Sequence, residues 1–241
     1  MVIFESSMNK DRRKTILITG ASRGLGFALT KQFISHQWKV VPLVRKNKDA
    51  TALKRISESS CFPIISDITS NSVHSSIRES MSVHDGIDVL INNAGAGGSG
   101  RLLSETKPDE VLTLIDIHCL GALRVTQAVM PFMMNDGIVI NISSRFGSIS
   151  KISTGELDHV ACSYSYRIAK AAQNMLTQCM CREFKDSGIR ICSVHPGLLR
   201  TDSASVDADK TPEEAAEILL DKINSMEHGR FYSLFEGTIE W

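Results

Sequence analysis

The sequence has no excess of charge of either sign and no apolar run as long as a membrane span. Its 27 basic and 27 acidic residues give a formal net charge of zero. The positive residues are scattered, apart from small groups at 10–14 and 45–48, so the basic stripe typical of nucleic-acid-binding proteins is missing. These absences argue against a nucleic acid and against a membrane as partners.

The six cysteines include no pair with the spacing of zinc ligands. Cys179 and Cys181 are two positions apart on a predicted helix, so their thiols point to different faces. We therefore expect reduced thiols, no metal site and a cytoplasmic protein. Residues 1–13 lack the apolar centre of a secretory signal. We interpret them as a flexible extension that precedes one domain, residues 14–241.

What the sequence does contain is an apolar run that leads into a glycine turn and then a helix. Residues 16–18 are all aliphatic, as in a parallel strand covered on both faces. Gly20, Gly24 and Gly26 follow, and glycine permits unusual dihedrals, close approach of a ligand and contact between helix and strand. The helix that begins near Gly24 offers unpaired N–H groups to an anion, which suits a dinucleotide pyrophosphate. A purely structural turn is the alternative.

The second predicted strand, Trp38–Val44, ends where an NAD site would carry an acidic residue for the ribose hydroxyl. Arg45 stands there instead. Together with Arg23 of the glycine turn, Arg45 can bind a ribose 2′-phosphate, which favours NADP(H) over NAD(H). The alternative is that both arginines are solvated surface charges. Pro42 removes a ladder donor from this strand and predicts an edge strand or a bulge.

The rest of the chain alternates between predicted strands and helices, which indicates a doubly wound α/β domain with a parallel sheet of about seven strands. Asp67 follows the third strand, at the sheet edge where ligands of such folds bind, and capping of the next helix is its alternative role. Thr211 starts a strong helix, with a proline and two acids after it. The other expected strands are 61–65, 88–91, 137–142 and 189–194, and the expected helices are 25–36, 50–57 and a long one at 108–134.

Three motifs resemble the short-chain dehydrogenase/reductase family. They are Thr19-Gly-x-x-x-Gly-x-Gly26, Asn92-Asn-Ala-Gly95 and Tyr166-x-x-x-Lys170. The similarity extends from Thr15 to the end of the chain, and the segment Ser144–Ile149 is similar to the subgroup of C-factor and sniffer-like carbonyl reductases. The resemblance implies a Rossmann-type fold and a nicotinamide cofactor.

The resemblance also implies a set of cofactor-binding residues. Asn92 to Gly95 would hold the central sheet and line the adenosine side, Asp67 would contact the adenine, and Pro196 and Gly197 would lie beside the nicotinamide. The full set is Gly20, Ser22, Arg23, Gly24, Leu25, Gly26, Arg45, Asp67, Ile68, Asn93, Ala94, Gly95, Tyr166, Lys170, Pro196, Gly197, Leu199 and Thr201.

Tyr166 and Lys170 are four residues apart and therefore share one face of a helix. A free tyrosine has a pKa of about 10, too high for efficient proton transfer near neutrality, and a nearby ammonium favours the phenolate. We therefore predict that Lys170 lowers the pKa of Tyr166; an ordinary tyrosine and a solvated lysine are the alternative. Either Ser143 or Ser144 can cap a turn, and the resemblance assigns the substrate oxygen to Ser144.

His118 departs from the family pattern, because an active-site asparagine stands at this position in the family. That asparagine is thought to fix a helix kink and a water that leads to the lysine. A histidine can hydrogen-bond but changes proton delivery. We list His118 as a catalytic candidate, with packing as the alternative. Residues 155–160 are expected to form a loop insertion beside the substrate pocket, and residues 203–210 a mobile lid.

Together these features predict an NADP(H)-dependent reduction of an aldehyde or ketone. Hydride would pass from the nicotinamide to the carbonyl carbon, Tyr166 would give the oxygen a proton, and Ser144 would orient it. Lys170 would also hold the ribose. The alternatives are an NAD-dependent alcohol dehydrogenase and a dinucleotide-binding sensor or signalling protein without turnover. The expected partners are a small carbonyl or alcohol substrate and further copies of the chain, in a homodimer or homotetramer built on the helices with His118 and Tyr166.

Overall fold

The computed structural model describes residues 12–81, 84–201 and 208–241. Within these residues the strands form one eight-stranded sheet in the order β3-β2-β1-β4-β5-β6-β7-β8, and every pairing is parallel except that of β7 with β8. The strands are β1 (Thr15–Thr19), β2 (Lys39–Val44), β3 (Ile64–Ile65), β4 (Ile87–Asn92), β5 (Met133–Ile142), β6 (Arg190–His195), β7 (Phe231–Ser233) and β8 (Gly237–Thr238).

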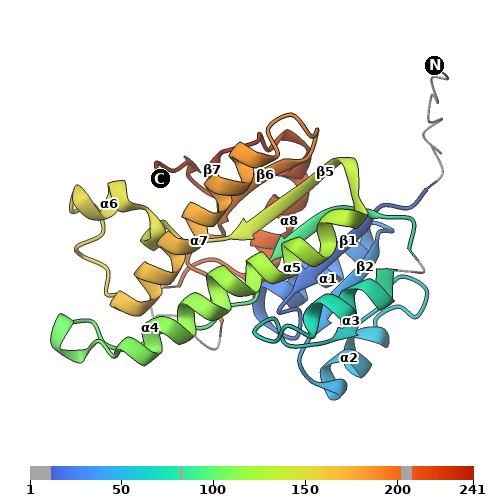
Figure 1. The fold of residues 1–241 in the computed structure, drawn as a ribbon, viewed down its shortest axis with the longest axis horizontal. Coiled ribbons are helices and arrows are strands. Elements are labelled where there is room, and N and C mark those ends of the chain that lie inside the picture. The colour runs from blue at the N-terminus through green and yellow to red at the C-terminus, as the bar shows by residue number, and fades with distance from the viewer. Residues whose placement is uncertain (1–11, 82–83, 202–207) are drawn as a thin grey trace.

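Helices cover both faces of this sheet (Figure 1). One face carries α1, α2 and α8, and the other carries α3, α5 and α7. The described helices are α1 (Gly24–Ser35), α2 (Asn47–Lys54), α3 (Val73–Met81), α4 (Pro108–Ile115), α5 (Gly121–Val129), α6 (Ile149–Ser153), α7 (Tyr164–Glu183) and α8 (Pro212–Lys222). Shorter helical turns are η1 (Leu103–Glu105), η2 (Asp116–Leu120), η3 (Met130–Phe132), η4 (Arg145–Gly147) and η5 (Ile223–Ser225).

The unbroken aliphatic run of β1 explains this two-sided arrangement. Ile16 and Ile18 pack into the core beneath α1 and α8, whereas Leu17 packs into the core beneath α3 and α5. All three side chains are fully buried, and burial of each stabilises the fold by about 1.5–3 kcal/mol. The prediction of a doubly wound α/β domain is confirmed. The eighth strand is the two-residue β8, which turns back antiparallel on β7.

The prediction that Pro42 marks an edge strand or a bulge is wrong. β2 lies inside the sheet, between β1 and β3. On the β3 side the ladder has a gap between the isolated bridge of Val40 with Cys61 and the pairing of Leu43 with Ile64. The N–H of Val40 points to that side, so strand alternation directs the nitrogen of Pro42 into the same gap. The missing donor therefore costs no ladder hydrogen bond.

The predicted long helix over 108–134 is present as one continuous helical run, Pro108–Phe132, which contains a π-helical turn. α4 is followed by the π-helical turn η2, then by α5 and the short turn η3, and β5 already begins at Met133. The whole helical run Pro108–Phe132 has 25 residues and a mean hydropathy of 1.2, enough by length and composition alone to cross a membrane. The expectation that no apolar run is as long as a membrane span is therefore corrected: this one helix is long and apolar enough. α4 packs on α7 and α5 packs on α3, the surroundings of a core helix in a globular domain.

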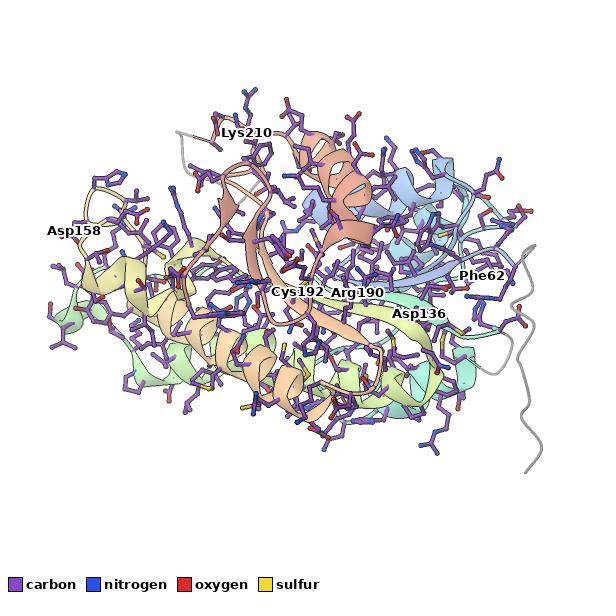
Figure 2. The ribbon with its side chains drawn as sticks, turned by 90° about the horizontal axis from the view of Figure 1, so that it is seen from above. Phe62, Asp136, Asp158, Arg190, Cys192 and Lys210 are labelled. Carbon is purple, nitrogen blue, oxygen red and sulfur yellow. The ribbon has the colours of Figure 1, made fainter. Side chains whose placement is uncertain are left out.

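The ends of the predicted segments also differ. Arg13 donates to the carbonyl oxygen of Gln37 (2.9 Å) and to Ser60 Oγ (2.6 Å), and Arg12 pairs with Asp88. Arg12 and Arg13 thus contact the domain, which the sequence analysis began at residue 14. Residues 1–11 lie outside the described ranges. The predicted loop 155–160 forms turns after α6, with Asp158 at its tip (Figure 2). Of the predicted lid, residues 203–207 lie outside the described ranges.

All six cysteines lie within the described ranges and are free thiols. Over the same ranges, no group of three or more histidine, cysteine, aspartate or glutamate side chains is placed to hold a metal ion.

Candidate functional site

A cavity of about 730 Å³ opens where β1, β2, β3 and β4 end. This volume lies within the range of about 300–1,000 Å³ that is usual for ligand pockets. Strand order reverses between β1 and β4, and open α/β sheets bind ligands at such a switch point. The predicted cofactor residues that line the cavity are Gly20, Ser22, Arg23, Gly24, Leu25, Arg45, Asp67, Ile68, Asn93, Ala94, Gly95 and Thr201.

The glycine turn forms the floor of the cavity. Gly20 and Gly24 have φ angles of +65° and +54°, which favour glycine. A Cβ on Gly26 would lie 2.4 Å from the carbonyl oxygen of Gly20, so Gly26 serves the contact between α1 and the turn and does not line the cavity. The N-cap residue of α1, Arg23, makes no side-chain capping hydrogen bond to the helix, and the first turn of α1 contains no acidic residue. The positive end of the α1 dipole faces the cavity at this turn, which suits an anion.

Charged residues line the cavity near the end of β2. Arg45 stands at the end of β2 and Arg23 in the glycine turn, and both reach the cavity. Asp67 also lines it and at the same time accepts hydrogen bonds from the N–H (3.0 Å) and the hydroxyl (2.9 Å) of Thr69. Asp67 thus caps a turn and faces the cavity, and the two predicted roles are compatible.

The exit of β4 is tied to its neighbouring strands by side-chain amides. Asn92 Nδ2 donates to Asn141 Oδ1 (2.9 Å) and to Thr126 Oγ1 (3.0 Å). Asn93 Nδ2 donates to the carbonyl oxygen of Thr19 (2.9 Å). These bonds hold β4 against β1 and β5, where the cavity is formed.

Ser144, Tyr166 and Lys170 converge at the end of β5. The Ser144 hydroxyl lies near enough to the Tyr166 hydroxyl to lower the pKa of that phenol. The neighbouring Ser143 instead donates to Asn174 Oδ1 (2.6 Å) inside the core. A Cβ on Gly147 would lie 2.7 Å from the carbonyl carbon of Lys170, so η4 packs directly on α7. This contact brings Ser144 to the helix that carries Tyr166.

Burial dominates the electrostatics of the pair. It raises the pKa of Tyr166 to about 12, and the nearby Ser144 hydroxyl offsets only part of that rise. Burial lowers the pKa of Lys170 to about 7. Lys170 Nζ donates to the carbonyl oxygen of Ile142 (2.6 Å) and to Gln173 Oε1 (2.9 Å), and lies 5.8 Å from the centre of the Tyr166 ring. Lys170 is not among the groups that shift the pKa of Tyr166 in this structure, and its hydrogen bonds go to other acceptors. That Lys170 lowers the pKa of Tyr166 stays a prediction.

His118 lies at the centre of η2 and is buried. Its ring is perpendicular to the Tyr166 ring, with 5.4 Å between centroids, and Nε2 lies 2.8 Å from the carbonyl oxygen of Ala96. Burial, followed by the charge of Lys170, lowers the pKa of His118 to about 3. The imidazole is thus neutral near pH 7. Nε2 lies 2.8 Å from the carbonyl oxygen and 3.3 Å from the N–H of Ala96, and the shorter contact favours a proton on Nε2. A neutral ring in this position holds the exit of β4 and does not deliver a proton as an imidazolium.

The remaining predicted residues lie beside the cavity and outside its lining. Pro196 and Gly197 follow β6, and Gly197 has a φ of +92° and packs against Phe235. Leu199 bridges to Lys210, which Figure 2 labels. The cavity does not include Ser144, His118, Tyr166 or Lys170 in its lining either.

His195 ends β6 and is buried. Burial, followed by the charges of Arg145, Lys151 and Lys170, lowers its pKa to about 3.

Sequence reasoning missed several residues of the cavity. Thr113, Asp116 and Ile117 line it from one helical face, and their spacing of three and four residues was the available signal. Arg200 also lines it; its guanidinium donates to the carbonyl oxygens of residues 208 (3.1 Å) and 209 (2.9 Å). The signal in the sequence for Arg200 was its position next to Thr201, a predicted cofactor-binding residue.

Known proteins resemble this chain in sequence and in fold. The short chain dehydrogenase profile matches residues 14–211. The C-signal of Myxococcus xanthus is 32% identical over 161 residues, which are 64% of this chain and 93% of that protein. The oxidoreductase UcpA of Escherichia coli K12 is 31% identical over 221 residues, 88% of this chain and 80% of UcpA.

Two solved structures share the fold over 95% of this chain and 100% of their own. They are an NADPH-bound carbonyl reductase from chicken fatty liver, with a TM-score of 0.83 and 24% identity, and the carbonyl reductase Sniffer of D. melanogaster, with a TM-score of 0.85 and 21% identity.

Proposed function

Because this chain belongs to the short-chain dehydrogenase family, we propose that it is an NADP(H)-dependent oxidoreductase that reduces the carbonyl group of a small aldehyde or ketone to an alcohol. The observation that carries this proposal is the convergence of Ser144, Tyr166 and Lys170 at the end of β5. The Ser144 hydroxyl lies near enough to the Tyr166 hydroxyl to lower the pKa of that phenol, and Lys170 stands one helical turn further along α7. The arrangement supplies a proton donor and an orienting hydroxyl for one substrate oxygen.

The cavity suits NADP(H). The start of α1 would hold the pyrophosphate, and Arg23 and Arg45 would bind the 2′-phosphate. When bound, this cofactor supplies a hydride. The similar chicken liver enzyme is described as NADPH-bound, and a similar short-chain dehydrogenase from Burkholderia multivorans as NADP-bound. Arg45, in the place of the acid that binds a ribose hydroxyl, makes NAD(H) the less favourable cofactor.

Tyr166 acts as the general acid. Its raised pKa, about 12, keeps the phenol protonated near neutrality. Transfer of that proton to an alkoxide oxygen, the stronger base, stays favourable, although a lower pKa would make the phenol a more efficient acid. Ser144 donates or accepts at the same oxygen and so fixes its position. Lys170, with a pKa of about 7, is charged in part of the molecules at neutral pH, and we assign it to the ribose hydroxyls. His118 positions the exit of β4 beneath the reacting groups.

The proposal includes a homodimer or homotetramer that packs through α4 and α7. Leu112 on α4 and Met175 on α7 are 65% and 63% exposed, and exposed apolar side chains on adjacent helices are typical of subunit contacts. The six free cysteines fit a reducing compartment, so we assign the protein to the cytoplasm.

The direct test mixes the protein with NADPH or NADH and a panel of aldehydes and ketones, and follows absorbance of the reduced nicotinamide. We expect turnover with NADPH that is lost in Tyr166→Phe, while NADPH binding is kept. Tight binding of NADPH without turnover on any carbonyl would instead support a dinucleotide-binding sensor. A preference for NAD and an alcohol would support a dehydrogenase.

A further inference from the structure

Residues 95–100 leave β4 and run between α4 and the first turn of α7, without regular structure. One end of this segment, which we call the β4 exit loop, is held by His118 through Ala96 (2.8 Å). At the other end, the carbonyl oxygen of Gly100 accepts the N–H of Tyr164 (3.3 Å). The β4 exit loop therefore connects the wall of the cavity, where Gly95 and Ala96 lie, to the helix that carries Tyr166.

Glu110, in the first turn of α4, joins the β4 exit loop to α7 at Ser99, next to the Gly100 end. Its Oε1 accepts the N–H (3.0 Å) and the hydroxyl (2.7 Å) of Ser99, and its Oε2 accepts the hydroxyl of Ser165 (2.6 Å). These hydrogen bonds, the one from Ser165 first, lower the pKa of Glu110. A carboxylate accepts all three because it has four lone-pair sites and no proton. Glutamine keeps one such oxygen, and its NH2 group can meet Ser165 only if the Ser165 hydroxyl turns away and accepts.

The hydrogen bonds continue from Ser165 to the backbone of Tyr166. Ser165 Oγ lies 3.2 Å from Ser163 Oγ, and Ser163 Oγ accepts the N–H of Tyr166 (3.2 Å) as the N-cap of α7. A Cβ on Gly98 would lie 2.4 Å from Ser165 Oγ and 2.5 Å from Ser163 Oγ. The loop thus lies directly against these two hydroxyls, and no side chain fits between them.

We propose that Glu110 is a positioning residue for the reaction: it fastens the β4 exit loop to the first turn of α7 and so fixes where the Tyr166 hydroxyl stands relative to Ser144 and the cavity. This inference rests on the proposed function. It gives the loop a role that none of the sequence motifs assigns, because Glu110 lies outside all three. Glu110 acts through Ser165 and Ser163 and touches no reacting atom.

The test compares Glu110→Gln, Ser165→Ala, the double variant and Asp109→Asn in the complete chain. Asp109 is the matched control, because it is the other acid in the first turn of α4 and its side chain is exposed. At saturating NADPH we expect Glu110→Gln and Ser165→Ala each to lower kcat about fivefold or more, since a misplacement of about 1 Å can cost about 100-fold. The Kd for NADPH should stay within about twofold, and the double variant should be no worse than Glu110→Gln, because both remove one chain of contacts.

Hydrogen exchange supplies a readout that does not need turnover. We expect faster amide exchange at residues 96–101 and 164–167 in Glu110→Gln, with the rest of α7 unchanged, and wild-type exchange in Asp109→Asn. Wild-type kcat and wild-type loop exchange in a folded Glu110→Gln would overturn the inference. So would multiplicative effects in the double variant, or an equal loss in Asp109→Asn. If the wild-type protein turns over no carbonyl, the proposed function fails, and loop exchange alone then shows whether Glu110 fastens the loop.

Discussion

Replacement of Arg45 by aspartate tests the choice between the two nicotinamide cofactors. Arg45 stands at the end of β2 and lines the cavity together with Arg23 and Asp67. A charged hydrogen bond to a phosphate contributes about 1.5–3 kcal/mol, and because Arg45 is exposed, solvent screening favours the lower part of that range. Aspartate removes this bond and adds repulsion.

We therefore expect the Kd for NADPH to rise by roughly 10- to 100-fold in Arg45→Asp, since 1.4 kcal/mol corresponds to about tenfold. The Kd for NADH should change by no more than about threefold, because NADH lacks the phosphate on which Arg45 acts. The difference should shrink at high salt, as expected for exposed charges. Titration of both cofactors, followed by nicotinamide fluorescence or calorimetry, gives both constants.

The matched control is Lys48→Asp, which makes the same change in charge three residues further on, at an exposed position outside the cavity. An equal loss of affinity for NADPH and NADH in Arg45→Asp would refute the phosphate contact. An equal effect of Lys48→Asp would show that only the overall charge of this face matters.

Three further predictions concern the glycine turn, the general acid and the buried lysine. Gly26→Ala should cost about 1–3 kcal/mol of unfolding free energy, because its Cβ would overlap the Gly20 carbonyl oxygen; Gly97→Ala, with no atom within 4 Å, is the control in urea denaturation, and equal stability of the two would contradict the packing argument. Tyr166→Phe should lower kcat by about 100-fold or more with an unchanged Kd for NADPH, and retained turnover in stopped assays would remove Tyr166 from the mechanism. Burial lowers the pKa of Lys170 to about 7, so above that pH the unfolded chain binds more protons than the folded chain, and the unfolding free energy should rise from pH 7 to pH 8.5. This slope should be smaller in Lys170→Met. An identical slope in the two proteins would show that Lys170 titrates normally.

The sequence was sufficient for the features that depend on local chemistry. The aliphatic run of β1 and the glycines after it predicted a buried strand, a turn and a helix, and the structure confirms them as β1 and α1. The helix start at Thr211 is also confirmed: Thr211 Oγ1 accepts the N–H of Glu214 (3.1 Å), whose carboxylate accepts the N–H of Thr211 (2.7 Å). Such signals lie within a few residues of one another and need no knowledge of the tertiary fold.

Features that depend on distant parts of the chain were not predictable in the same way. Pro42 is tolerated inside the sheet because of a gap in the pairing with β3, which is set by residues about 20 positions later. The direction of Lys170 is set by a carbonyl oxygen of β5 and by Gln173, and the pKa of Tyr166 is set mainly by burial. The role of Glu110 could not be predicted from the sequence, because its partners, Ser99 and Ser165, lie 11 and 55 positions away.

The π-helical turn η2 has a consequence for how this chain can vary. Upstream of it, Thr113 faces the cavity, and downstream of it, Val125 and Val129 face the sheet. An α-helix turns by about 100° per residue, so the number of residues in Asp116–Leu120 sets the angular phase between those two faces. A π-helical turn closes with one residue more than an α-helical turn, so deletion of a single residue there would let the run continue as α-helix, with Val125 and Val129 still against the sheet and the bulge at His118 removed. Deletion of a residue between this turn and Val125 would instead rotate those two side chains away from the sheet.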